Sequence, residues 1–324
     1  MPAETLLEFE EPIAVLLKEV DALELLPHTD ARDRQIEQLR RRVQSVRAEL
    51  YRSLTPWQRV LVARHPNRPA LEQYIERLFT GFVEIHGDRR FADDHAIMTG
   101  FAEYKGEPVL VVGHVKGTDT KEKIFRNFGY ARPEGYRKAM RAMRMAEKFG
   151  RPIFVFVDTP AAYPGIDSEE RGVAEAIAVN LRDMMTLETP VVVAVTGEGG
   201  SGGALGIAIG DRVLMQEFSV YSVIPPEGCA AILWRDANKK IEAATALKIT
   251  APDMVALGLV DGIIPEPPGG AHNDMDAATA LVDQALSAAL AELSPLTVPQ
   301  RLDMRYEKFR RMGDVGFDDP GSTP

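Results

Sequence analysis

A run of small residues at 197–204 is the part of this sequence best suited to chemistry. It reads Gly-Glu-Gly-Gly-Ser-Gly-Gly-Ala, and it holds five of the 26 glycines of the chain. Because glycine has no side chain, backbone N–H groups in such a run can approach a bound molecule closely. The run follows a predicted buried strand at 191–195 and precedes a predicted helical segment at 204–209. Loops in this position commonly bind ligands.

Two motifs in this run predict different functions. Residues 197–202 spell G-x-G-x-x-G, and Glu217 follows at the spacing of a dinucleotide-binding fingerprint. Residues 199–203 spell G-x-S-x-G, the nucleophile elbow of hydrolases, in which Ser201 would attack the substrate. A Walker phosphate loop is excluded because no Gly-Lys-Ser/Thr follows.

A third function for this run is an oxyanion hole, in which main-chain N–H groups stabilise a negatively charged oxygen. Six of the eight residues at 197–204 are glycine or alanine, so a substrate could reach the main chain. A serine hydrolase would need a histidine base after Ser201, and only His272 follows it. The run therefore favours an oxyanion hole, with a serine hydrolase kept as the alternative.

A second candidate loop, at 158–165, reads Asp-Thr-Pro-Ala-Ala-Tyr-Pro-Gly and follows a predicted strand at 153–157. Its two prolines fix the backbone and its two alanines keep it slim, which suits a wall shaped to a ligand. Asp158 could act as a general base, although an aspartate before Thr-Pro is more often a turn former. Both loops follow predicted parallel strands, so we expect them to meet at one edge of the sheet.

The segment 116–148 is basic, with ten Lys or Arg against four Asp or Glu, within a chain of net charge −10. Lys121, Lys123 and Arg126 precede a predicted helix at 133–148, and we expect them to attract anionic groups. A solvated helix face with ion pairs to the acidic remainder is the alternative.

The composition is that of a globular protein and argues against several other classes. The chain has 324 residues, 45% hydrophobic and 27% charged, which is typical of globular proteins. Its acidity disfavours nonspecific nucleic-acid binding. The single cysteine, Cys229, permits no intrachain disulfide and no cysteine cluster for a structural zinc. The first four residues lack the basic start of a signal peptide, and no apolar run reaches the ~20 residues of a membrane span. We expect a cytoplasmic protein.

Strands and helices alternate after residue 95, which predicts an α/β fold with a mainly parallel sheet. Besides the elements above, we expect a hairpin of 96–104 and 109–113, helices at 168–187 and 276–293, and a short strand at 213–215.

The first 53 residues are predicted to form a helical extension that contacts other subunits. Five apolar residues recur there at heptad spacing, which fits a helix packed on its own domain or, less simply, on a partner chain. They are Ile36, Leu39, Val43, Val46 and Leu50. We expect the catalytic domain at 54–295 and a C-terminal tail at 296–324, frayed from Gly313 onward.

Five motifs in the chain resemble, in sequence and order, those of the carboxyltransferase α-subunit family of bacterial acetyl-CoA carboxylases. They are Arg-Asn-Phe-Gly at 126–129, Pro-Glu-Gly-Tyr-Arg-Lys-Ala at 133–139, the runs at 158–165 and 197–204, and Pro-Glu-Gly-Cys-Ala at 226–230. The resemblance extends over most of the chain. Ala161 departs from it, because the family pattern has glycine there, and we expect a negative φ at this residue.

The resemblance implies a crotonase-like (ClpP-like) spiral of ββα units with an N-terminal helical extension. It implies transfer of the carboxyl group from carboxybiotin to acetyl-CoA, which gives malonyl-CoA, the first committed step of fatty acid synthesis. Biotin would be attached to a biotin carboxyl carrier protein and not to this chain. Further partners would be a zinc-bearing β subunit, in an α2β2 heterotetramer, and a biotin carboxylase.

The same resemblance implies roles for individual residues. Gly202 and Gly203 would donate backbone N–H groups to the ureido oxygen of biotin. The carboxybiotin pocket would be lined by Ala161, Ala162, Tyr163, Gly199, Gly200 and Ser201. The local excess of positive charge, and not the resemblance, suggests that Lys121, Lys123 and Arg126 bind CoA phosphates or the carboxylate on biotin. No metal is expected on this chain. The alternative in which the chain is not an enzyme is a noncatalytic scaffold subunit.

Overall fold

An eight-stranded sheet forms the centre of the computed structural model, which describes residues 5–313. Its order is β1-β2-β3-β4-β5-β6-β8, with β7 paired to β5 beyond the end of β6. The pairs β1/β2 and β2/β3 are antiparallel and all others are parallel, which confirms the predicted hairpin and parallel sheet. The strands are β1 (Thr80–Glu84), β2 (Ile97–Tyr104), β3 (Glu107–His114), β4 (Ile153–Thr159), β5 (Val191–Gly200), β6 (Arg212–Gln216), β7 (Val220–Ser222) and β8 (Gly262–Ile264).

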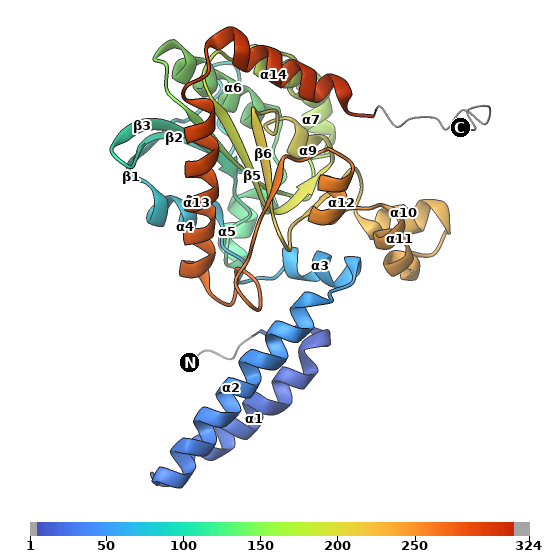
Figure 1. Cartoon of the computed structure of the whole chain (residues 1–324). Coiled ribbons are helices and arrows are strands. Elements are labelled where there is room, and N and C mark those ends of the chain that lie inside the picture. Colours follow the sequence, from blue (N-terminus) through green and yellow to red (C-terminus); the bar gives the residue numbers. More distant parts are fainter. Residues whose placement is uncertain (1–4, 314–324) are drawn as a thin grey trace, which may run out of the picture.

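Helices cover both faces of the sheet (Figure 1), as parallel strands require. The longer helices are α1 (Glu11–Glu24), α2 (Asp30–Arg52), α3 (Pro56–Ala63), α4 (Leu71–Leu78), α6 (Pro133–Lys148), α8 (Val173–Met184), α10 (Pro226–Leu233), α13 (Met275–Leu293) and α14 (Val298–Arg311). The shorter ones are η1 (Glu8–Glu10), α5 (Thr120–Phe125), η2 (Asn127–Gly129), α7 (Ile166–Glu170), α9 (Ser201–Leu205), η3 (Ala237–Lys239), α11 (Lys240–Ala246) and α12 (Ala251–Ala256). Within residues 5–313, none of them is both long enough and apolar enough to cross a membrane.

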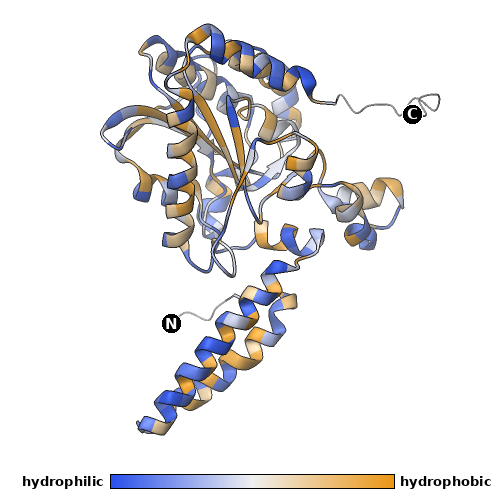
Figure 2. Ribbon diagram, in the orientation of Figure 1, coloured by the Kyte–Doolittle hydropathy of each residue, from blue (hydrophilic) through white to orange (hydrophobic). Residues whose placement is uncertain are grey.

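Strand β4 shows how the apolar runs build the core. Ile153, Val155 and Val157 face the side covered by α6 and α8, whereas Phe154 and Phe156 face the side covered by α4 and α13. All five side chains are buried. The strands therefore appear as continuous apolar runs in the sequence and as hydrophobic ribbons in Figure 2.

The N-terminal helices α1 and α2 form a hairpin that extends away from the sheet domain (Figure 1). The heptad residues Ile36 and Val43 of α2 are buried, as are Ile13 and Val20 of α1, which packs against α2. Two of the five heptad residues are thus covered within the chain, whereas Leu39, Val46 and Leu50 stay partly exposed. At the base of the hairpin, the hydroxyl of Tyr51 donates to Glu10 over 2.9 Å.

Two helices differ from their predicted bounds. The helix expected at 168–187 is divided into α7 and α8, because Gly172 adopts a left-handed conformation with φ of 76° between them. The helical segment expected at 204–209 is α9, which begins earlier, at Ser201, and ends at Leu205.

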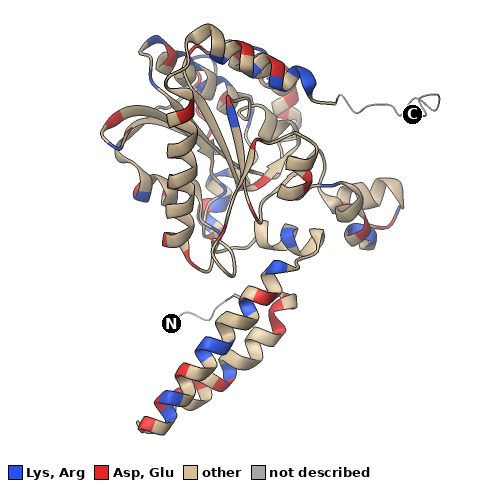
Figure 3. Ribbon diagram, viewed as in Figure 1, with Lys and Arg blue, Asp and Glu red and all other residues tan. Residues whose placement is uncertain are grey.

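The segment expected to be a C-terminal tail contains α14, which packs on the sheet domain through a buried arginine. The guanidinium of Arg305 donates to both carboxylate oxygens of Asp211 over 2.9 and 2.8 Å. It also donates to the carbonyls of Met184, Leu187 and Thr189. The predicted fraying concerns residues that, after Gly313, lie outside the described chain. Figure 3 shows that the solvent side of α14 is charged.

Arg305→Ala should lower the free energy of unfolding by about 3–5 kcal/mol, because Asp211 would remain buried without its partner. Urea denaturation measures the change. Arg310→Ala, at an exposed position of the same helix, is the matched control and should change it by less than about 0.5 kcal/mol. Equal effects of the two substitutions would contradict this anchoring role.

Candidate active site

The glycine run is half strand and half helix, so its prediction as a loop is wrong. Residues 197–200 continue β5, in which Gly199 pairs with Thr159 of β4 and Tyr221 of β7, and α9 begins at the next residue. The sequence predicted the strand only as far as residue 195, because the apolar run ends there and the glycines that follow are not typical of a strand.

Most glycines of the run are required by close packing. A Cβ atom at Gly200 would overlap the carbonyl of Pro160, and one at Gly203 would overlap the backbone of Ala161 and Ala162. A Cβ at Gly199 would lie 2.7 Å from the ring of Tyr221, and Gly197 is confined by Asp158. These contacts bring the two candidate loops together, as the sequence predicted.

Gly202 is the exception in the run. A Cβ atom there would meet only the Cδ1 atom of Ile177, at 3.5 Å, so the space in front of this residue is open. Gly202 and Gly203 lie in the first turn of α9, where backbone N–H groups have no acceptor within the helix. Gly202 therefore lies beside an open position, and Gly203, the next residue, is buried against Ala161 and Ala162.

The loop after β4 is held as a rigid wall against these donors. The hydroxyl of Thr159 donates to the carbonyls of Gly129 and Ala161 over 2.7 and 2.9 Å. The N–H of Tyr163 donates to the carbonyl of Ala131 over 2.9 Å, and Ala131 also forms a bridge with Ala162. Ala161 is absent from the residues with positive φ within 5–313, as expected for an alanine that replaces glycine without strain.

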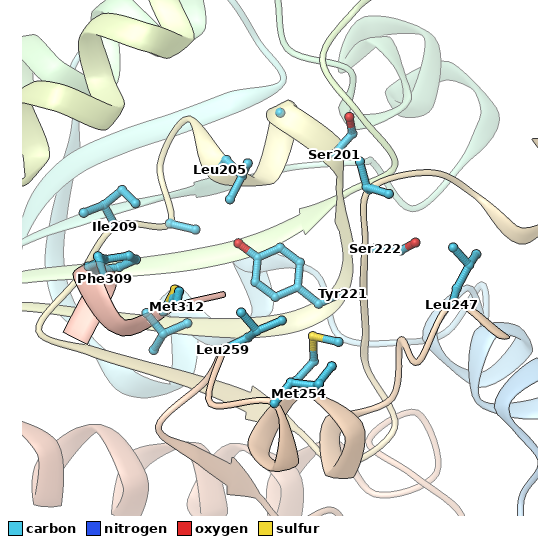
Figure 4. Close-up of a pocket in the computed structure, with 15 residues that line it drawn as sticks. Ser201, Leu205, Ile209, Tyr221, Ser222, Leu247, Met254, Leu259, Phe309 and Met312 are labelled. Atoms are coloured by element: carbon cyan, nitrogen blue, oxygen red, sulfur yellow. The ribbon is translucent and has the colours of Figure 1, made fainter. Parts of the chain in front are cut away.

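An apolar cavity of about 350 Å³ opens beside Gly202 (Figure 4). Tyr221 projects into its centre and Ser201 lies at one side (Figure 4), and Gly202 also lines the cavity. Phe309 and Met312, at the end of α14 and just beyond it, form another. The remaining lining is apolar apart from Ser222: Leu205, Ala208, Ile209, Val213, Val223, Leu247, Met254, Leu257 and Leu259. The cavity suits an apolar ring or chain next to the two donors.

A network of charged side chains joins the strand ends behind the glycine run. The ammonium of Lys116 contacts Asp158 over 2.6 Å and Glu198 over 2.8 Å. Arg64 donates to Glu198 over 2.7 Å and to Glu227 over 2.6 Å. Asp158 also accepts from the N–H of Glu198, so its carboxylate fixes two strand ends and is not a free general base.

The network sets the protonation of its members. Burial alone would lower the pKa of Lys116, but Asp158 and Glu198 raise it above its usual value. Burial would raise the pKa of Glu198, yet the charges of Lys116 and Arg64 lower it to about 2. Lys116 and Glu198 therefore stay charged at neutral pH.

Sequence reasoning missed this network as a unit. Lys116 and Glu198 each follow the end of a predicted strand, and this shared position was the only indication in the sequence that they could meet. Nothing in the sequence indicated that Arg64 joins them, because it lies at the end of α3, far from Glu198 in sequence.

Neither of the two other motif functions is supported by the geometry. Ser201 has the left-handed conformation of an elbow, with φ of 52°, but no hydrogen bond from it to a histidine is found among residues 5–313. The carboxylate of Glu217 accepts from the N–H of Glu266, between the ends of β6 and β8, instead of facing a nucleotide site.

The three predicted anion-binding residues lie on and after α5, apart from the glycine donors. Arg126 contacts Glu72 over 3.2 Å and donates to the carbonyl of His95, so its charge is already partnered. Lys121 and Lys123 have no ion pair within 4 Å in the part of the chain that the structure describes.

His114 lies buried at the end of β3, close to the backbone of Gly203. Burial, together with the nearby charge of Lys116, lowers the pKa of this imidazole to about 3. The ring is therefore neutral at pH 7 and adds no charge next to the backbone of Gly203.

A family model described as "Acetyl co-enzyme A carboxylase carboxyltransferase-like" matches residues 6–313. The carboxyl transferase subunit alpha of acetyl-coenzyme A carboxylase from Geobacter metallireducens is 53% identical over 313 residues, which cover 96% of this chain and 98% of the relative. The corresponding subunit from Anoxybacillus flavithermus is 53% identical over 310 residues, covering 95% of each chain.

Solved structures show the same fold at low identity. Transcarboxylase 12S, with methylmalonyl-coenzyme A bound, superposes with a TM-score of 0.58 at 18% identity, over 72% of this chain. The match spans 44% of the transcarboxylase chain. A Pseudomonas malonate decarboxylase hetero-tetramer gives 0.55 at 20% identity, over 67% of this chain and 86% of that chain. The predicted crotonase-like α/β fold is confirmed.

Replacing His114 with glutamine should reduce the loss of stability in acid. Between pH 6.5 and about 3, the unfolded chain binds a proton at this ring and the folded chain does not, so folding weakens as pH falls. The contribution is about 1.4 kcal/mol per pH unit and is removed in the variant. Urea denaturation at pH 8 and at pH 5 measures it.

The comparison at pH 8 is the control, because the ring is neutral there in both states and any difference reports packing alone. An unchanged dependence on pH between the two proteins would contradict a buried neutral His114.

Proposed function

Because the chain belongs to the acetyl-coenzyme A carboxylase carboxyltransferase family, we propose that it works as the alpha subunit of that enzyme. It transfers the carboxyl group of carboxybiotin, which is attached to the carrier protein, to acetyl-CoA. The product is malonyl-CoA, in the first committed step of fatty acid synthesis. The serine hydrolase and scaffold alternatives have no support in the family match.

The observation that best supports a catalytic role is the pair of main-chain donors in the first turn of α9, one of which, at Gly202, lies beside an open position. Carboxybiotin supplies the carboxyl group and, on losing it, leaves negative charge on its ureido oxygen. Gly202 and Gly203 direct their N–H groups at this oxygen in our proposal, and the first turn of α9 presents both. Loss of one such donor typically lowers the rate ~10²–10³-fold.

In our proposal the apolar cavity beside Gly202 holds the ring system and chain of biotin. Ala161, Ala162 and Tyr163 do not line this cavity; Ala161 and Ala162 pack against Gly203 instead. Of the lining proposed from the sequence, only Ser201 borders this cavity together with Gly202, whereas Gly199 and Gly200 border a separate, smaller pocket. Lys116 and Glu198, at the strand ends beside the glycine run, are engaged with each other, so in our proposal main-chain groups and not these side chains act on the substrate.

The partner subunit covers the lobe of α10 and α11 in this proposal. Large apolar side chains are exposed there, with Val223 75%, Ile232 69%, Leu233 66% and Ile241 53% accessible. Patches of this kind on a monomer mark interfaces. Val223 also lines the cavity, so a subunit bound here would close the site.

The complete assembly is proposed to be an α2β2 heterotetramer in the cytoplasm, with zinc on the β subunit, acting with the carrier protein and a biotin carboxylase. The N-terminal extension, residues 1–53, is proposed to contribute to subunit contacts. The mass of the purified complex tests the α2β2 stoichiometry, and its zinc content tests the presence of zinc.

The function is tested by co-expressing the chain with a β-type subunit and assaying carboxyl exchange between malonyl-CoA and biocytin. We expect the complex to be active and each subunit alone to be inactive. Failure of the intact complex to transfer carboxyl groups would overturn the proposal.

Gly202→Ala should lower kcat about 100-fold, because its methyl group would enter the open position and displace the substrate from the donors. Since nothing but Ile177 lies near that methyl group, the free energy of unfolding should change by less than about 1 kcal/mol.

Ser201→Ala is the matched control at the neighbouring residue and should keep kcat within a few-fold. Loss of nearly all activity in Ser201→Ala would instead favour a serine nucleophile, and full activity in Gly202→Ala would contradict the position of the donors.

A further inference from the structure

An exposed apolar surface lies on α5 and η2, outside the site described above. Ile124, Phe125 and Phe128 are 65%, 55% and 51% exposed, within five residues of one another. Lys121 and Lys123 lie on the same short segment. We call these five residues the α5 patch. Three large apolar side chains this close together on a surface are typical of a binding site for another macromolecule.

Phe128 is held in a left-handed backbone conformation that residues with a Cβ atom disfavour. Asn127, Phe128 and Gly129 have φ of 48°, 55° and 79°, so three consecutive residues are left-handed, two of them with a Cβ atom. The side-chain amide of Asn127 donates to the carbonyl of Tyr130 over 2.8 Å and fixes the turn. Such strain persists where the surrounding structure requires the conformation, and it concentrates at functional sites.

The α5 patch borders the wall of the candidate active site. The carbonyl of Gly129, next to Phe128, accepts from the hydroxyl of Thr159, which also donates to Ala161. Ala131, two residues further on, is bridged to Ala162. One hydrogen-bonded step therefore separates the patch from the wall that faces the Gly203 backbone.

The patch also carries two lysines. Lys121 and Lys123 have no ion pair within 4 Å among residues 5–313, whereas Arg126 between the patch residues contacts Glu72. The neighbouring carboxylates of Asp119 and Glu122 accept from backbone N–H groups of α5 and of the preceding turn. Two lysines beside an apolar centre complement an acidic surface that has an apolar spot of its own.

We propose that the α5 patch is the docking surface for the protein domain that carries biotin, and that this domain meets it with an acidic face. The inference rests on the proposed function, in which biotin arrives attached to a protein and must reach the wall at Ala161. A carrier that arrives and leaves needs a small interface with a charged rim, which the α5 patch offers. The larger apolar surface of α10 and α11 suits the permanent subunit instead.

The experiment compares two substrates in the complex of this chain with its partner subunit: the biotinylated carrier domain and free biocytin. Phe128→Ser and Ile124→Ser should each raise KM for the carrier about ten-fold, as expected for an interface hot spot, and leave kcat/KM for biocytin unchanged. Phe149→Ser is the matched control, because Phe149 is 59% exposed at the end of α6, and it should change neither value.

Charge is tested with Lys123→Glu, which should raise KM for the carrier and remove its increase with ionic strength. Lys148→Glu, at an exposed position next to Phe149, is the control and should keep that increase.

Three results would overturn the docking surface: an equal loss with both substrates, dissociation of the partner subunit from the Phe128→Ser variant, or an unchanged KM for the carrier. A wild-type complex that is inactive even with biocytin would overturn the proposed function itself, so the two failures are distinguishable.

Discussion

Backbone-to-backbone contact between the glycine run and the loop after β4 leaves no room for a Cβ atom at Gly200 or Gly203. This contact fixes the distance between the ends of β4 and β5, and it places the first turn of α9 against Ala161 and Ala162. The wall, the two donors and the cavity beside Gly202 all take their positions from it. The glycines matter to the site because the absence of a side chain at each allows this close contact.

Charged groups reinforce this contact from behind. Lys116 lies between Asp158 and Glu198, so one ammonium group ties the ends of β3, β4 and β5, and Arg64 extends the tie to α3 and α10. Partly buried charges stabilise an arrangement only when each has its partner, so these residues depend on one another. The network therefore makes the geometry of the site specific, whereas the apolar core makes the sheet stable.

The sequence predicted the sheet well because its strands are buried on both faces and appear as apolar runs, as in β4 and β5. It did not predict that residues 197–200 continue β5, because glycine strands lack that pattern, nor the break at Gly172, where the conformation of one residue divides a helical segment. The two loops were placed together from topology alone. Pairing between Arg64 and Glu198 could not be predicted, since it depends on where α3 crosses the sheet.

The position of α14 has a consequence for the order in which the molecule is made. Translation runs from the N-terminus, and every strand of the sheet precedes Phe309 and Met312, which complete one side of the cavity. A nascent chain can thus assemble its sheet while the cavity still lacks that side and Asp211 still lacks Arg305. The cavity is therefore enclosed only after α14 has been made, and a chain that ends before α14 would lack Phe309 and Met312 on that side.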